Sequence, residues 1–139
     1  MDARLRPHEL VLGSDAVGRD LRSVAHVRHA VGDFLDHEGV ADAREDVLLV
    51  VSELVTNSLI HTDGAPGVVV RHVANPERID IEISDRSSTP PVPRTIGVGA
   101  LGGRGLTIVD RLSSAWGVRP VREGKTTWAT VPVHAHRAS

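Results

Sequence analysis

Cysteine is absent from this chain of 139 residues, which excludes disulfides, thiolate metal sites and cysteine nucleophiles. Aromatic residues make up only 2%, so a hydrophobic core has to be built from valine, leucine, isoleucine and alanine. No apolar run approaches the roughly 20 residues that a membrane helix needs. The first ten residues also lack the apolar stretch of a secretory signal. We therefore expect a cytoplasmic protein that does not associate with a membrane.

An excess of charge of either sign is also missing. The chain has 16 basic and 18 acidic side chains, for a net charge of −2, and this balance argues against direct binding to nucleic acid. Apolar residues account for 40% and charged residues for 24%, which is typical of a globular domain. The length predicts a single domain over residues 1–139 with enough chain to bury a core.

Apolar residues recur at helical spacing in two segments of the N-terminal half. The first covers residues 19–37 and is expected to stop at Gly39. The second covers residues 42–62, where Asp42 is a candidate N-cap and Glu45 completes a capping box. A further helix is predicted from Gly105 onwards.

Short runs of apolar residues bounded by turn signals predict five strands. They cover residues 9–13, 68–73, 79–84, 115–121 and 126–133, with the first as a short edge strand. Short turns between successive strands imply antiparallel pairs, so the pattern predicts an α+β fold. We expect a two-layer sandwich, in which helices cover one face of a mostly antiparallel sheet. Residues 86–103, rich in Ser, Thr, Pro and Gly, are expected to form a functional lid.

Three polar residues lie four apart on the second predicted helix. Glu53, Asn57 and His61 therefore share one stripe beside the buried face. An amide oxygen suits Mg²⁺, and a carboxylate one turn away can orient or deprotonate a nucleophile. The alternative is an ordinary amphipathic helix whose polar edge holds these residues, and spacing alone does not exclude it.

Asp85 ends the alternating strand, in register with its inward-facing isoleucines. A carboxylate on the buried face needs a partner, because an unpaired buried charge is costly. The amino group of a ligand is one candidate partner. The alternative is that the strand ends at Ser84 and that Asp85 caps a turn.

Glycines open the third predicted helix at Gly102, Gly103 and Gly105. Free N–H groups and the helix dipole make such a start suitable for an anion, and glycine allows a phosphate to approach the backbone closely. The Gly-Lys-Thr at 124–126 is not a Walker A loop, because the upstream glycine is missing. Two of the eight histidines, His134 and His136, lie in a C-terminal tail and are not expected to bind metal.

These features occur in a fixed order that resembles the GHKL family of ATP-binding domains, which includes histidine kinases and chaperone ATPases. Residues 53–61 resemble its N-box, Asp85 the aspartate of the next box, residues 103–106 its glycine box and residues 124–128 its final box. The resemblance covers roughly residues 20–133. It implies a Bergerat-type ATP-binding fold, and the short length points to the branch of anti-sigma factor serine/threonine kinases.

The resemblance also implies roles for single residues. Asn57 would coordinate Mg²⁺, Glu53 would act as the general base, and Asp85 would accept a hydrogen bond from the adenine amino group. The glycine box, comprising Gly103, Arg104, Gly105 and Leu106, would bind the phosphates through backbone amides.

A threonine of the final box would support adenine. The box pattern favours Thr126, whereas strand parity favours Thr127, which lies in register with Ala129 and Val131.

One box departs from the family pattern. The family's second box reads Asp-x-Gly-x-Gly, whereas residues 85–89 read Asp-Arg-Ser-Ser-Thr. The missing glycines bear on catalysis more than on nucleotide binding, so two functions stay open. The first is an ATP- and Mg²⁺-dependent serine/threonine kinase that phosphorylates an anti-anti-sigma protein and sequesters a sigma factor, with a homodimer allowed. The second is a regulator-binding module that holds a nucleotide without turnover.

Overall fold

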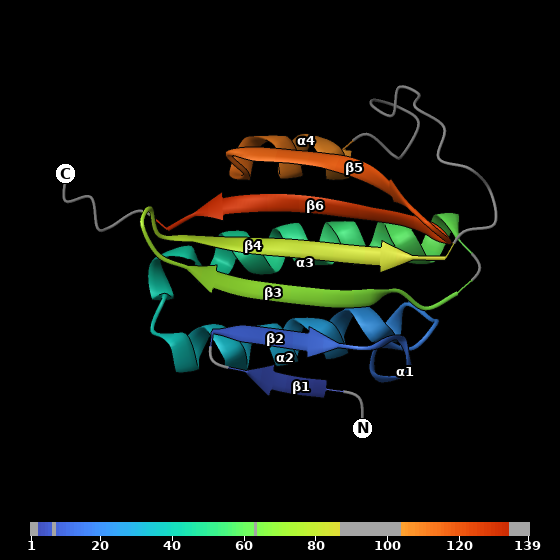
Figure 1. Ribbon diagram of the computed structural model, residues 1–139, viewed down its shortest axis with the longest axis horizontal. Helices are drawn as coiled ribbons and strands as arrows, with labels where there is room; N and C mark the ends of the chain where they lie inside the picture. The colour runs from blue at the N-terminus through green and yellow to red at the C-terminus, as the bar shows by residue number, and fades with distance from the viewer. Residues whose placement is uncertain (1–2, 7, 63, 87–103, 134–139) are drawn as a thin grey trace.

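A computed structural model describes residues 3–6, 8–62, 64–86 and 104–133. Six strands form one sheet in the order β1-β2-β3-β4-β6-β5, and all neighbours are antiparallel (Figure 1). The strands are β1 (Ala3–Arg6), β2 (Glu9–Leu12), β3 (Gly67–Val73), β4 (Arg78–Asp85), β5 (Ala115–Val121) and β6 (Gly124–Pro132). The helices are α1 (Ser14–Val17), α2 (Arg22–Glu38), α3 (Ala41–His61) and α4 (Arg104–Leu112).

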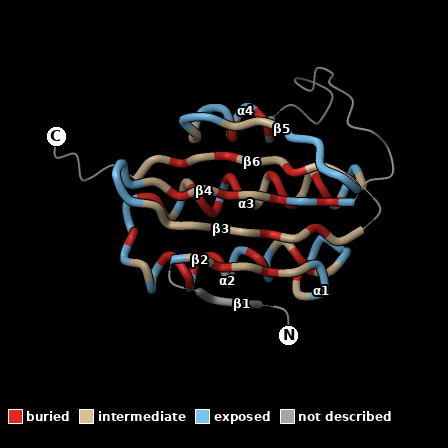
Figure 2. The backbone as a smooth tube through the Cα atoms, in the orientation of Figure 1, coloured by how far each residue is buried: buried red, intermediate tan, exposed pale blue. Residues whose placement is uncertain are grey.

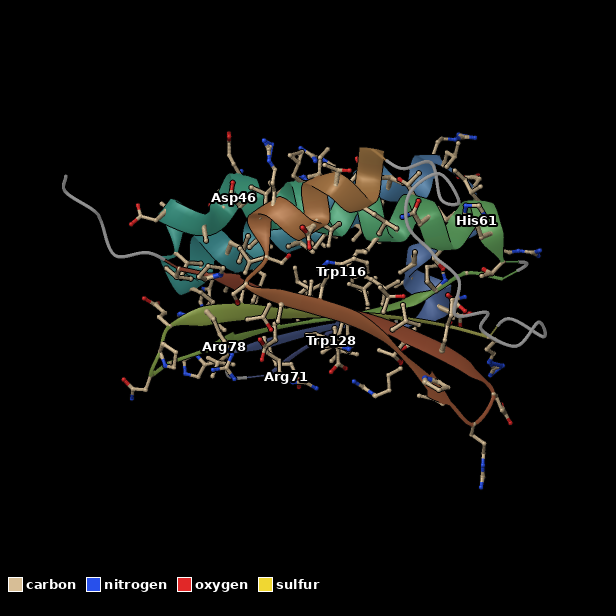
Figure 3. All side chains as sticks on the ribbon, turned by 90° about the horizontal axis from the view of Figure 1, so that it is seen from above. Asp46, His61, Arg71, Arg78, Trp116 and Trp128 are labelled. Carbon is tan, nitrogen blue, oxygen red and sulfur yellow. The ribbon has the colours of Figure 1, made fainter. Side chains whose placement is uncertain are left out.

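The helices form a second layer on one face of the sheet, as the side view shows (Figure 3). Helix α3 packs against α2, α4 and the central strands β4 and β6. Trp128, Arg71 and Arg78 extend from the opposite face, which no described helix covers. The expected α+β sandwich with a mostly antiparallel sheet is therefore confirmed.

The core lies between the two layers because β4 alternates strictly. Ile79, Ile81 and Ile83 are buried beneath the helices and pair with Val131, Ala129 and Thr127 of β6. Buried residues are concentrated in α3 and the central strands (Figure 2). As expected from the composition, the largest fully buried side chains are all leucine, isoleucine or valine.

Two local predictions were wrong. The N-cap of α3 is Val40, which makes no side-chain cap bond, and Asp42 lies inside the first turn. Because Val40 is buried in the core, apolar packing rather than a capping box sets the start of α3. Strand β2 is not at the edge, because it lies between β1 and β3. The Ala3–Arg6 segment is too short and polar to stand out as a strand in the sequence.

Other predicted boundaries agree closely with the structure. Gly39 caps α2 with a left-handed φ of 72°, as expected of a glycine at a helix end. The α4 helix begins at Arg104, one residue before the predicted start. Most of the predicted lid, residues 87–103, lies outside the described part of the chain. Within the described residues, no helix has the length and apolarity needed to cross a membrane.

Candidate functional site

Helix α3 carries the predicted polar stripe along the border of its buried face. Glu53 and Asn57 are half-buried, whereas His61 at the end of the helix is exposed. The stripe therefore continues to the helix end, but only its first two members lie against the protein interior. In the described part of the chain, Glu53 makes no hydrogen bond or ion pair. Its carboxylate is therefore not committed to a structural contact there.

Asp85 lies on the buried face of the sheet, as the alternation of β4 predicts. It is the last residue of β4, and only 6% of it is exposed, so the alternative of a turn cap after Ser84 was wrong. Its Oδ2 accepts a hydrogen bond from Ser58 Oγ at 3.3 Å. Its Oδ1 accepts one from Lys125 Nζ at 3.1 Å. The buried carboxylate thus has partners within the protein, where the sequence had suggested a ligand.

The contact between Ser58 and Asp85 joins α3 to the end of β4. Asn57 precedes Ser58, so the Cα atoms of these two residues are about 3.8 Å apart. The Nδ2 atom of Asn57 is buried and finds no hydrogen-bond partner among the described residues. A buried polar atom without a partner is uncommon and calls for an explanation. Since a flip of the amide exchanges its oxygen and nitrogen, the position suits a magnesium ligand or a bound water.

The two candidate threonines lie on opposite faces of β6. Thr127 pairs with Ile83 on the helix-facing side, as strand parity predicts, and is half-buried. Thr126 pairs with Ser84 on the other face, where the two hydroxyl groups share a hydrogen bond of 2.9 Å. Of the two, Thr127 therefore shares a face with Asp85.

The glycine box leads into α4. Arg104 and Gly105 are the first two residues of this helix, and Gly103 lies outside the described residues. Leu106 is buried, and α4 packs against α3. In Figure 1, α4 begins towards the same end of the molecule as the C-terminal ends of α3 and β4. The start of α4 thus shares one end of the sandwich with Asp85 and Asn57.

Gly124 at the turn between β5 and β6 is required by a close approach of two backbones. A Cβ atom there would overlap the carbonyl oxygen of Asp85 and crowd the Cα of Arg86. This glycine lets the turn pack directly on the end of β4. The following residue, Lys125, is then placed opposite Asp85 in the register of the two strands.

A cavity of about 360 Å³ opens at the same end of the sheet. Its lining includes Gly13, Val68, Ser84 and Asp85, but neither Glu53 nor Asn57. The cavity therefore reaches the candidate site only at Asp85.

Sequence reasoning missed Ser58 and Lys125. Ser58 lies inside the segment that resembles the N-box, and Lys125 lies inside the final box. Both residues therefore belong to motifs that the sequence analysis had already identified. Their role was not visible because each contact with Asp85 spans a long separation, 27 residues for Ser58 and 40 for Lys125.

A family model of the histidine kinase-like ATPase domain matches residues 17–131. No functionally curated protein matches the sequence. Among solved structures, a blue-light activated histidine kinase from Erythrobacter litoralis EL346 is similar, with a TM-score of 0.50 and 21% identity over 66% of this chain. The histidine kinase domain of that protein gives a TM-score of 0.52 and 19% identity over 81% of this chain. The chain spans 30% and 64% of the lengths of these two structures.

Proposed function

Because the chain belongs to the histidine kinase-like ATPase domain family, we propose that it is an ATP- and Mg²⁺-dependent regulatory kinase that phosphorylates serine or threonine on a partner protein. The observation that carries the proposal is Asp85, a carboxylate buried at the end of β4. Through Ser58 it is joined to the helix that bears Asn57 and Glu53. An acceptor, a candidate metal ligand and a candidate base thus lie along one junction between helix and sheet.

Asp85 is the residue proposed to select adenine. A carboxylate has about four lone-pair sites, and the bonds from Ser58 and Lys125 use one on each oxygen. Each oxygen therefore retains acceptor capacity for an exocyclic amino group. The hydroxyl of Ser58 fixes the orientation of the carboxylate, which favours a directional bond to the base.

Asn57 is the residue proposed to hold magnesium. Its amide is half-buried, and its Nδ2 has no hydrogen-bond partner in the described chain. With the amide flipped, its oxygen takes that position and fits the ion. When bound, Mg²⁺ supplies positive charge that offsets the charge developing on transferred phosphate. The role of Asn57 is to orient a hard oxygen ligand at the border of the core, where competing water is limited.

Glu53 is proposed as the general base. In the transfer, the hydroxyl oxygen of the partner bonds to the γ-phosphorus, the bond from that phosphorus to the β,γ-bridging oxygen breaks, and ADP leaves. Glu53 accepts the hydroxyl proton and releases it to solvent. A positioned base of this kind contributes about 10²–10⁴-fold in rate. Its carboxylate is free for this task as far as the described contacts go.

The partner is proposed from the sequence resemblance to the anti-sigma kinase branch. It is an anti-anti-sigma protein with a target serine or threonine, and a sigma factor is the second partner that the kinase sequesters. A homodimer is compatible with this role. Direct contact with nucleic acid is not part of the proposal, in keeping with the net charge of −2.

Transfer of labelled γ-phosphate tests the proposal. The purified protein is mixed with labelled ATP, Mg²⁺ and each candidate anti-anti-sigma protein, and we expect label on a serine or threonine of one of them. Glu53→Gln should retain ATP binding but lose about 100-fold or more in transfer rate. Glu45→Gln is the matched control, because Glu45 is exposed on the same helix, and it should transfer at the wild-type rate.

A second function, nucleotide-dependent binding of a regulator without turnover, is favoured by two observations. Residues 87–89 lack the glycines of the family pattern, and Lys125 already contacts the carboxylate proposed for adenine. If the wild type binds ATP and a sigma factor but labels no candidate partner, and Glu53→Gln binds that factor equally well, this second function replaces the first.

A further inference from the structure

Two histidines and a glutamate come together far from the candidate nucleotide site. His8 lies in the turn between β1 and β2, Glu38 ends α2, and His72 lies near the end of β3. The Nδ1 atoms of both histidines lie 2.8 Å from Glu38 Oε1. The three candidate ligand atoms all lie within 4.8 Å of one another. From this geometry we infer a binding site for a divalent transition metal of the Zn²⁺ class.

The residue types fit that ion. Imidazole suits zinc and its neighbours, and two histidines with one carboxylate form a known kind of three-ligand zinc set. Ligands at about 2.0–2.2 Å from zinc in tetrahedral geometry are about 3.4 Å apart. The present separations, up to 4.8 Å, therefore need adjustments of up to about 1.4 Å at the widest pair. His8, with 70% of its side chain exposed in a turn, has room to make them.

The surroundings of His72 are those of a metal ligand. Its second ring nitrogen, Nε2, lies 2.6 Å from Glu77 Oε2. A carboxylate on the far nitrogen of a ligating histidine fixes its tautomer and orientation. The backbone N–H of His72 also donates to the carbonyl of His8 at 2.9 Å, which holds the two ligands together. The site is thus oriented by contacts that do not involve the proposed metal.

The electrostatics of Glu38 also favour a cation. Glu38 is the last residue of α2, where the negative end of the helix dipole attracts positive charge. The side chain of Glu38 is only 8% exposed, so its carboxylate faces the two histidines rather than solvent.

Metal bound at this site would cross-link parts of the fold and would not take part in nucleotide binding. It links the β1–β2 turn to α2 and β3, which are distant in sequence. His72 pairs with Ile79 at the start of β4, and from there to Asp85 the strand rises about 20 Å. Zinc should therefore raise thermal stability without changing the response to ATP.

Calorimetric titration of the full chain, without tag or nucleotide, tests the inference. Metal binding requires neutral imidazole, and the pKa of His72 is raised, because the bonds and charges of Glu38 and Glu77 outweigh the opposing effect of burial. The titration is therefore run at about pH 8. We expect one Zn²⁺ per chain with a Kd of about 1 µM or tighter, and no such site for Mg²⁺.

Variants locate the metal. His8→Gln, Glu38→Gln and His72→Gln should each weaken zinc binding by more than about tenfold, and Glu77→Gln by about tenfold, since it removes only the orienting carboxylate. His29→Gln, an exposed histidine paired with Asp33, and a double variant of His134 and His136 should bind as the wild type does. Because His8 is exposed, its variant tests the site even if Glu38→Gln does not fold. No zinc binding by the wild type, or equal binding by all variants, would overturn the inference.

Discussion

Asp85 brings a carboxylate to the buried face of the sheet, and its two contacts explain how the fold tolerates it. Ser58 and Lys125 each satisfy one oxygen, and a hydrogen-bonded ion pair offsets part of the cost of burying the group. These contacts fix the orientation of the carboxylate but leave part of its hydrogen-bond acceptor capacity unused. A carboxylate held in this way can select a ligand by the direction of a hydrogen bond as well as by charge.

Asp85→Asn should therefore change nucleotide selection more than nucleotide affinity. The amide presents a donor where the adenine amino group needs an acceptor, and a mismatched polar contact in a buried position costs about 1–3 kcal/mol. We expect the preference for ATP over GTP to fall by about 10-fold or more, measured as the ratio of their dissociation constants. An unchanged ratio would show that Asp85 does not contact adenine.

Asn57→Ala should weaken binding of ATP in the presence of Mg²⁺ but have little effect in its absence. The Nδ2 atom of Asn57 is buried and has no partner in the described chain, so the loss of this side chain breaks no visible contact and removes only the proposed ligand. Titrations with and without Mg²⁺ measure the difference. His61→Ala is the control, because His61 lies one turn further on the same stripe but is exposed. If the two substitutions have equal effects on Mg²⁺-dependent ATP binding, Asn57 is not a ligand of the metal.

At the scale of elements, the site depends on the turn between β5 and β6 packing on the end of β4. The register that places Lys125 opposite Asp85 requires the close approach at Gly124. The end of β4 thereby meets β6 through Lys125 and α3 through Ser58. The positions of Asp85 and Lys125 relative to each other are thus set by strand pairing rather than by local sequence.

Gly124→Ala should destabilise this junction. The added methyl group would overlap the carbonyl oxygen of Asp85, and relieving such overlap by a backbone shift costs about 1–3 kcal/mol. Chemical denaturation should show a loss in that range, together with weaker ATP binding. Gly64→Ala is the control, because a Cβ there meets no atom within 4 Å, and it should stay within about 0.5 kcal/mol of the wild type.

At the scale of the whole molecule, the two candidate sites lie at opposite ends of the sandwich. The carboxyl end of β4 carries the candidate nucleotide site, and the opposite end of the sheet carries the cluster of His8, Glu38 and His72. Because the central strands join them in one antiparallel sheet, a ligand at either end should stabilise the fold independently of the other.

Binding of ATP with Mg²⁺ should raise the melting temperature. A ligand that binds only the folded state adds about 2.7 kcal/mol at 100 times its Kd, which corresponds to about 10 °C for a domain of this size. Thermal melts at millimolar nucleotide with excess Mg²⁺, on protein freed of zinc beforehand, measure the shift. If ATP does not change the melting temperature, the proposed function is wrong. The zinc site is judged separately, by the calorimetric titration without nucleotide.

The sequence by itself determined the elements and the face that each one buries. The alternation of Ile79, Ile81 and Ile83 predicted both the strand and the inward position of Asp85, because a period of two assigns every second side chain to the core. Gly39 marked a helix end for a backbone reason that is equally local. The order of the boxes indicated the family, and the cytoplasmic location and the single domain over residues 1–139 stay predictions.

Only the tertiary structure decided which polar groups meet. Ser58, Asp85 and Lys125 converge because helix packing and strand register bring together segments 27 and 40 residues apart, and no local pattern encodes either. The same holds for His8, Glu38 and His72, whose contacts span 30 and 34 residues. Local sequence sets which face a side chain points to, but its neighbours across that face are chosen by the packing of the whole chain.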